Sequence, residues 1–238
     1  RILYFPSVGS TMDVAKQEAE KNASEGTVVI SNSQTSGRGR FGRKWVSGFG
    51  ENLLFSVLLY PEQKILSSLN IIASLSLLRA IQQQTTLSPT LKWPNDVLLR
   101  GKKVGGVLIE TAVLAGRVKY AIIGFGVNIN SDPTQVPEIS DFSTSVANEL
   151  GREVFRETLF ESVLVQLSDL YNSLRGWMDA RNQWESCLET IGSHVRVVWG
   201  NEIEEGLAEG VDHDGNLILR RSDGTIVTLS GGDVTLKG

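Results

Sequence analysis

The chain has 238 residues, of which 41% are hydrophobic and 21% are charged, and its formal net charge is −4. This composition is that of an ordinary globular protein with a sizeable core, and the length fits one main domain with a small appendage. The acidic balance gives no general attraction to nucleic acid or to anionic membranes.

Several features of the sequence bear on the cellular compartment. Cys187 is the only cysteine, so an intrachain disulfide is impossible, which suits a reducing compartment. The first residues lack the apolar stretch of a signal peptide, and apolar runs such as residues 120–127 are too short to cross a bilayer. We therefore expect a cytoplasmic protein that does not enter a membrane. Because the chain begins with Arg1 and not with methionine, removal of an upstream segment is left open.

The first sixty residues alternate between strand and helix signals. Residues 2–5 predict a short strand, and Ser10 stands where a helix should be N-capped, with the helix running to Lys21. A β-branched run predicts a strand over residues 27–31. A glycine- and arginine-rich stretch follows, named here the Gly/Arg segment (residues 37–50), and a buried strand is predicted from residue 53 to 60.

The middle of the chain combines one buried helix with a series of strands. Apolar residues at three- and four-residue spacings predict a helix from residue 69 to about 85. Strands are then predicted over residues 97–99, 103–111 and 118–127, and an apolar stripe predicts a helix over residues 156–174.

The composition changes again after Ile191. Strands are predicted over residues 194–199, 202–208, 216–220 and 225–229, separated by turns of the Asp-Gly and Gly-Asn type. Short strands with such turns are typical of a small β-barrel. We therefore divide the chain into residues 1–188 and 189–238.

The Gly/Arg segment contains the string GRGRFGRKW, residues 37–45. Its glycines leave backbone N–H groups free to approach an anion, and its arginines can bind a carboxylate or phosphate in two-point fashion. Glycine and arginine together favour a loop that closes over a charged ligand. A solvated surface loop or an RNA-contacting segment has the same composition, and both alternatives stay open at this point.

A second string, KWPND, occupies residues 92–96 and is followed by KKVGGV at residues 102–107. Proline fixes the chain direction and leaves Asn95 and Asp96 at a bend between two strands, where polar side chains are held firmly. An ordinary β-turn with Trp93 in the core and solvated lysines explains the same letters.

A third string, GFGVNIN at residues 124–130, ends an apolar strand with alternating glycines. Glycine inside a strand indicates the close approach of a ligand or another backbone, although a bulge would explain it equally well. His194 and His213 have no partner at metal-ligand spacing and are interpreted as structural.

The three strings in this order resemble the biotin–protein ligase family, which is related to the bacterial biotin repressor. The resemblance extends from about Val8 to the tail, which ends GGDVTLKG. It implies an α+β fold: a mixed sheet flanked by helices on one side, like the class II aminoacyl-tRNA synthetase core, plus a small C-terminal SH3-like β-barrel. The catalytic pattern begins within the first dozen residues, so the chain resembles the monofunctional type without a helix-turn-helix domain, and no specific DNA binding is expected.

The same resemblance implies the activity: ATP converts biotin to biotinyl-5'-AMP, and the biotinyl group passes to a lysine of a biotin carboxyl carrier domain of acetyl-CoA carboxylase or a related carboxylase. Mg²⁺ is expected with ATP, and Asp96 is its nearest acidic contact. A homodimer is plausible for the family. The alternatives are a lipoate or octanoate ligase of the related fold, against which KWPND argues, and a nucleic-acid-binding module.

Residue roles also follow from the resemblance. Lys103 would contact the reacting carboxyl–phosphate region, under a loop that carries the catalytic Arg38 and Arg40. The implied ligand contacts are Ser10, Thr11 and Gln34 on the biotin rings with Gly106 packed against them, Gly37 and Gly39 in the loop, Trp45 on adenine, and Asn95, Asp96 and Asn128 beside the nucleotide. Two contacts depart from the family's residue types: Met12 replaces an asparagine, and Lys237 replaces an arginine of the repressor branch.

Overall fold

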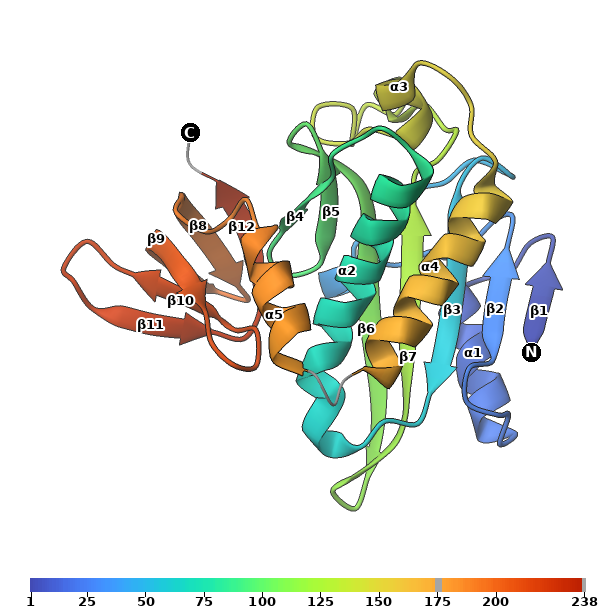
Figure 1. Ribbon diagram of the computed structural model, residues 1–238, viewed down its shortest axis with the longest axis horizontal. Coiled ribbons are helices and arrows are strands. Elements are labelled where there is room, and N and C mark those ends of the chain that lie inside the picture. The colour runs from blue at the N-terminus through green and yellow to red at the C-terminus, as the bar shows by residue number, and fades with distance from the viewer. Residues whose placement is uncertain (174–176, 237–238) are drawn as a thin grey trace.

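The computed structural model describes residues 1–173 and 177–236 and contains two sheets, with helices packed on the larger one (Figure 1). The larger sheet has seven strands in the order β1-β2-β3-β7-β6-β5-β4. They are β1 (Ile2–Phe5), β2 (Val28–Ser31), β3 (Leu53–Leu59), β4 (Thr90–Lys92), β5 (Asp96–Leu99), β6 (Lys102–Leu114) and β7 (Arg117–Val127). β1 and β2 are parallel and the other neighbours are antiparallel, so the predicted mixed sheet is confirmed.

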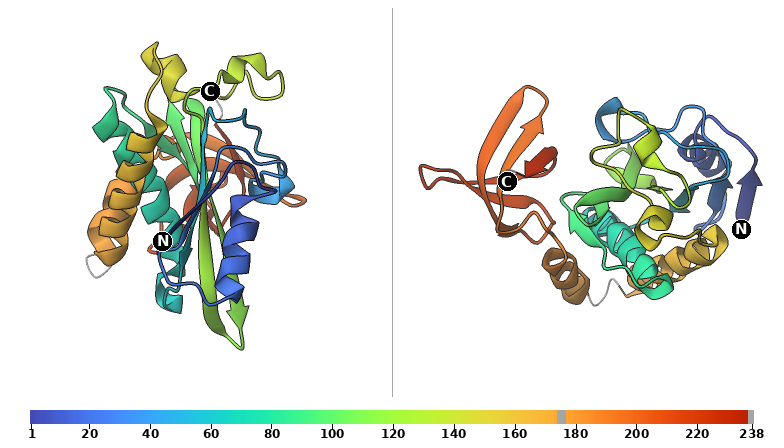
Figure 2. Two further views of the ribbon diagram at one scale, coloured as in Figure 1. Left: turned by 90° about the vertical axis from the view of Figure 1, so that its right-hand side faces the viewer. Right: turned by 90° about the horizontal axis from the view of Figure 1, so that it is seen from above.

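Helices cover both faces of this sheet. α2 (Leu66–Gln84) and α4 (Arg156–Asn172) pack against each other on one face, and α1 (Thr11–Glu20) lies on the opposite face, as Figure 2 shows edge-on. The expectation of helices on one side only is therefore wrong. Successive side chains of a strand point to opposite faces, so a central strand such as β3 buries Phe55 against α4 and Leu58 beneath α1.

α2 is the central core helix. Together with the preceding turn, Gln63–Gln84, it is long and apolar enough to cross a membrane, but 67% of its most apolar window is buried inside the protein. Its position between the sheet and the helices α4 and α5 (Trp177–Ser186) accounts for the apolar composition.

The smaller sheet is formed by the C-terminal residues. It has five antiparallel strands in the order β11-β10-β9-β8-β12, and in the part of the chain that is described its end strands β11 and β12 do not pair. The strands are β8 (His194–Trp199), β9 (Glu202–Val211), β10 (Leu217–Arg220), β11 (Ile226–Leu229) and β12 (Asp233–Leu236).

Backbone and side-chain hydrogen bonds join the two sheets. The indole N–H of Trp93 donates to the carbonyl of Gly215 at 2.9 Å, and its backbone N–H donates to the Thr190 hydroxyl at 2.9 Å. Leu91 and Leu188 form an isolated parallel bridge. The KWPND segment is therefore attached to the chain that leads into the C-terminal sheet and to the turn between β9 and β10.

The predicted strands and long helices occur close to their expected bounds, including the Ser10 N-cap, whose hydroxyl accepts from the Met12 N–H. The final residue of the predicted helix 156–174 lies outside the described residues. The sequence did not predict α3 (Val146–Leu150), α5 or β12.

Candidate functional site

One cavity of about 510 Å³ brings most of the expected site residues together. The cavity lies on one face of the large sheet, where β6 begins and β7 ends. The Gly/Arg segment covers it. Its walls include thirteen of the expected contacts, namely Ser10, Thr11, Met12, Gln34, Arg38, Gly39, Arg40, Trp45, Asn95, Asp96, Lys103, Gly106 and Asn128.

One wall of the cavity is neutral and rich in hydrogen-bonding groups. Thr11 donates to Gln34 Oε1 from its backbone N–H at 2.7 Å and from its hydroxyl at 3.0 Å. The Thr11 hydroxyl also lies 2.8 Å from that of Ser56 on β3. These bonds fix the Gln34 amide at the N-terminus of α1, so this wall offers preorganised donors and acceptors.

Three glycines leave room along the sheet beneath the cavity. Gly106 on β6 pairs with Gly126 on β7, and Gly124 lies two residues earlier on β7. A Cβ on Gly126 would stand 2.7 Å from the Trp45 ring, and a Cβ on Gly124 would stand 2.8 Å from Met12 Sδ. The register shift in this strand pair lies at Ala112/Val113, away from these glycines. The close-approach interpretation of the alternating glycines therefore fits better than a bulge.

Lys103 and Asp96 form an ion pair inside the cavity, with Nζ 2.6 Å from Oδ1. The Lys103 ammonium also lies 5.7 Å from the centre of the Trp45 ring, a cation–π distance. A Cβ on Gly106 would lie only 3.1 Å from Lys103 Cε, so glycine at 106 makes space for this lysine. The Trp45 indole N–H is buried and lacks a hydrogen-bond partner among the described residues.

Arg40 is a partly buried cation without a carboxylate at ion-pair distance in the described chain. Its Nη1 donates to the Gly232 carbonyl at 3.1 Å and to Asn95 Oδ1 at 3.4 Å. Burial lowers the pKa of Arg40, an effect that the nearby Asp96 and Asp233 partly oppose. An arginine whose charge is poorly compensated in a cavity wall is suited to binding an anion.

Arg38 has the opposite environment. Its guanidinium makes two hydrogen bonds with Glu110, at 2.8 and 3.1 Å, and an ion pair with Asp13 at 2.9 Å. The hydrogen bond with Glu110 is the main reason that the pKa of Arg38 is raised. Two carboxylates therefore neutralise this arginine from outside the cavity. We name Asp13, Arg38 and Glu110 the Arg38 clamp.

The remaining expected residues have structural contacts. Asn95 donates from Nδ2 to the Val107 carbonyl at 2.5 Å, and the buried Asn128 donates to the Thr144 carbonyl at 3.1 Å. Gly37 is buried behind the cavity wall, where a Cβ would lie 2.9 Å from the Trp45 carbonyl oxygen. Lys237 lies outside the described residues.

Sequence reasoning missed several residues of the site. Glu110, Asp13 and Asp233 approach the Gly/Arg segment from β6, α1 and the C-terminal sheet, and Phe142 and Glu138 line the cavity from the loop before α3. Nothing local in the sequence marks these positions, because each meets the segment only through the fold. No group of three or more His, Cys, Asp and Glu side chains that could hold a metal ion occurs in the described part.

Two family models match the chain. The biotin/lipoate A/B protein ligase family model matches residues 4–128, and the biotin protein ligase C-terminal domain model matches residues 190–237. The chain is 32% identical to the bifunctional ligase/repressor BirA of Bacillus subtilis, over 94% of this chain and 70% of that protein. It is also 32% identical to the biotin–[acetyl-CoA-carboxylase] ligase of Mycobacterium tuberculosis, over 95% of this chain and 85% of that protein.

A solved structure is similar over the full length. The biotin protein ligase of Aquifex aeolicus, in complex with biotin and ATP, superimposes with a TM-score of 0.83 at 30% identity, covering 100% of this chain and 98% of that one. Both family models, the two relatives and this structure agree. The chain therefore belongs to the biotin protein ligase family.

Proposed function

We propose that the cavity binds biotin and ATP next to each other, with the biotin rings at the neutral wall and the phosphates at Arg40 and Lys103. As a biotin protein ligase the chain activates biotin with ATP and transfers the biotinyl group to a lysine of a carrier domain. The observation that carries the proposal for the site is the division of one cavity into a neutral, hydrogen-bonding wall and a cationic wall, joined by a glycine-lined floor.

The first chemical step joins two anions. A carboxylate oxygen of biotin attacks the α-phosphorus of ATP, the bond to pyrophosphate breaks, and biotinyl-5'-AMP forms. The negative charge in the transition state requires fixed cations and donors, which is mainly an electrostatic task. In the second step the carrier lysine nitrogen attacks the acyl carbon, AMP leaves, and the lysine loses a proton.

Each side chain of the cavity would contact a different part of the two substrates. Lys103 would release Asp96 and contact the reacting carboxyl–phosphate region, and Arg40 would bind the phosphates. Trp45, whose indole N–H has no hydrogen-bond partner within residues 1–173 and 177–236, would cover adenine. The neutral wall of Ser10, Thr11 and Gln34 would hold the biotin rings, with Met12 and Gly106 in van der Waals contact. Asn128 would border the nucleotide, and Gly37 and Gly39 would shape the Gly/Arg segment that covers it.

A magnesium ion would come with the nucleotide. Mg²⁺ is usually held by one or two carboxylates together with substrate phosphates, so Asp96 alone fits a nucleotide-bound ion and not a site made only of protein. Asp96 would become available to the ion when Lys103 turns to the substrate.

Proposals for the acceptor, the cellular compartment, the domains and the oligomeric state accompany the proposed site. We propose that the acceptor is a biotin carboxyl carrier domain, supported by relatives named as ligases of acetyl-CoA carboxylase, and that the reaction takes place in the cytoplasm, where ATP is available. We further propose a class II synthetase-like core at residues 1–188 and an SH3-like unit at residues 189–238. A homodimer and the absence of specific DNA binding by these 238 residues are likewise proposals.

An ATP–pyrophosphate exchange assay tests the proposal. Labelled pyrophosphate should enter ATP when biotin is present and should not do so with lipoate or without an acid. Exchange with lipoate but not biotin would favour the lipoate ligase alternative. No exchange with either acid, together with binding to RNA, would favour the nucleic-acid-binding module.

A further inference from the structure

We propose that Arg38 is a positioning residue: Glu110 and Asp13 hold it outside the reacting centre, and this clamp keeps the Gly/Arg segment closed over biotinyl-AMP. The inference deepens the proposed function and rests on it. It differs from the expectation that Arg38 and Arg40 both act directly on the reacting charges.

The contacts of Arg38 support a mechanical role. All three charged partners in the clamp come from different parts of the fold: Asp13 from the first turn of α1, Arg38 from the Gly/Arg segment and Glu110 from β6. Neither carboxylate lines the cavity, although parts of Arg38 do. Closing the segment therefore joins it to a helix and a strand that are fixed in the core.

The charge balance of the clamp also supports a positioning role for Arg38. One guanidinium faces two carboxylates, so the three side chains together carry a net charge of −1. An arginine in this state has little attraction left for the carboxylate or phosphates of a substrate. Arg40 retains the capacity to bind an anion. Its Nη1 lies 3.1 Å from the Gly232 carbonyl oxygen, and it has no ion-pair partner in the described chain.

The geometry also favours arginine over lysine at position 38. Glu110 accepts one hydrogen bond from Nε and one from Nη2 on its two carboxylate oxygens, the fork arrangement that only a guanidinium provides. Asp13 bonds to the same Nη2, so the planar group is held on two sides. A lysine would keep the charge but would lose this orientation.

The clamp predicts that Glu110→Gln and Arg38→Gln behave alike. Each should release biotinyl-AMP up to about fivefold faster than the unmodified enzyme, the range expected for losing a partly exposed charge pair. Each should also biotinylate unrelated lysines, because the reactive anhydride escapes. The rate of adenylate formation in a single turnover should fall by no more than about threefold. Arg38→Lys should not restore retention.

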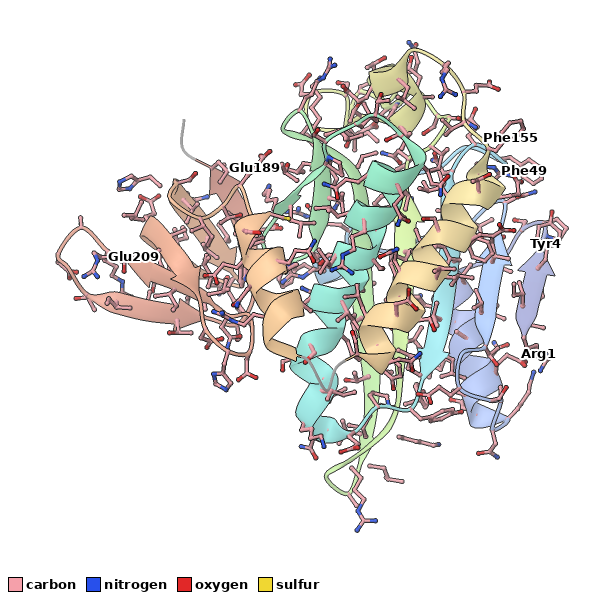
Figure 3. All side chains as sticks on the ribbon, viewed as in Figure 1. Arg1, Tyr4, Phe49, Phe155, Glu189 and Glu209 are labelled. Carbon is pink, nitrogen blue, oxygen red and sulfur yellow. The ribbon has the colours of Figure 1, made fainter. Side chains whose placement is uncertain are left out.

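Arg40→Gln provides the contrast and Glu209→Gln the control. Loss of a cation at the reacting centre should lower the rate of adenylate formation by about 100- to 1000-fold. Glu209 makes the same two-bonded contact with Arg220 on the C-terminal sheet, at 2.6 and 3.0 Å, and Figure 3 shows it at the far end of the molecule. Its substitution should leave retention unchanged.

A double variant decides whether Glu110 acts through Arg38. If it does, adding Glu110→Gln to Arg38→Gln should change the release of biotinyl-AMP by less than about twofold. Independent, multiplying effects would overturn the proposal, as would a loss of adenylate formation in Arg38→Gln as large as that in Arg40→Gln. If the unmodified enzyme itself fails to exchange pyrophosphate with biotin, the proposed function is at fault and not the clamp.

Discussion

Gly126 lies on the cavity face of β7 against the Trp45 ring, and adding a methyl group there should disturb that ring and not the core on the opposite face of the sheet. In Gly126→Ala the new Cβ would lie 2.7, 2.9 and 2.9 Å from three carbons of the Trp45 ring. Carbon atoms in contact are normally about 3.5–4.0 Å apart, so the ring must move by roughly 1 Å. Trp45 belongs to the Gly/Arg segment, so the strain falls on closure of the segment and not on the folded core.

The expected magnitude follows from overpacking. An inserted methyl group in a packed site costs about 1–3 kcal/mol, which corresponds to about 5- to 150-fold weaker retention of biotinyl-AMP. The melting temperature of the ligand-free protein should change by no more than about 2 °C. Dissociation of the adenylate by rapid dilution and thermal melting measure the two quantities separately.

Gly105→Ala, on the neighbouring strand β6, is the matched control. Its Cβ would lie 3.0 Å from Cδ2 of Leu77, a fully buried residue of α2, and 3.2 Å from the Gly126 carbonyl oxygen. This variant should lower the melting temperature by about 2–10 °C. In a Trp45→Ala background, Gly126→Ala should lose most of its effect on retention. The reasoning is refuted if Gly126→Ala destabilises the ligand-free protein as much as Gly105→Ala, or if its effect persists without the indole.

Three further predictions follow from the site and the core. Lys103→Ala should slow adenylate formation by about 100- to 1000-fold in single-turnover assays, whereas Lys102→Ala, an exposed neighbour on β6, should be nearly normal; equal losses would contradict the assignment. Hydrogen exchange in residues 37–50 should slow when biotin binds, because the ligand anion compensates the charge of Arg40 and adds charge-assisted hydrogen bonds to the segment; equal protection in both states would argue against closure. Burial raises the pKa of the Cys187 thiol, so less thiolate is present at pH 8 and alkylation should be slower than in the denatured chain; equal rates would show that the thiol is accessible.

Much of the fold could be predicted because strong local patterns coincide with burial. β3 has apolar residues on both faces, and the stripe of α4 packs on α2 and the sheet. The missed elements lack such patterns. α3 has five residues and depends on its Ser145 N-cap and on Gly151 at φ 71°, and β12 is a four-residue strand.

The site was predictable by residue type and only partly by role. Glycine, arginine and the KWPND bend are local signals that marked the strings as candidates, and the family resemblance of the three strings implied that their residues share one site. The sequence could not distinguish Arg38 from Arg40, which stand two residues apart on one loop. The difference between them arises from Glu110, 72 positions away, and from the C-terminal Gly232, 192 positions from Arg40.

The contact between Trp93 and Gly215 bears on the cooperativity of unfolding. The turn containing Gly215 rests on the core: a Cβ at this glycine would lie 3.1 Å from Ile71, and Asp214 accepts a hydrogen bond from Ser67 at 3.0 Å. Detaching the C-terminal sheet would leave the Trp93 indole N–H without its acceptor and would expose apolar surface of α2 to water. The two units that the sequence separates at residue 188 should therefore melt in one transition, and a fragment ending there would lose the support of its KWPND hairpin.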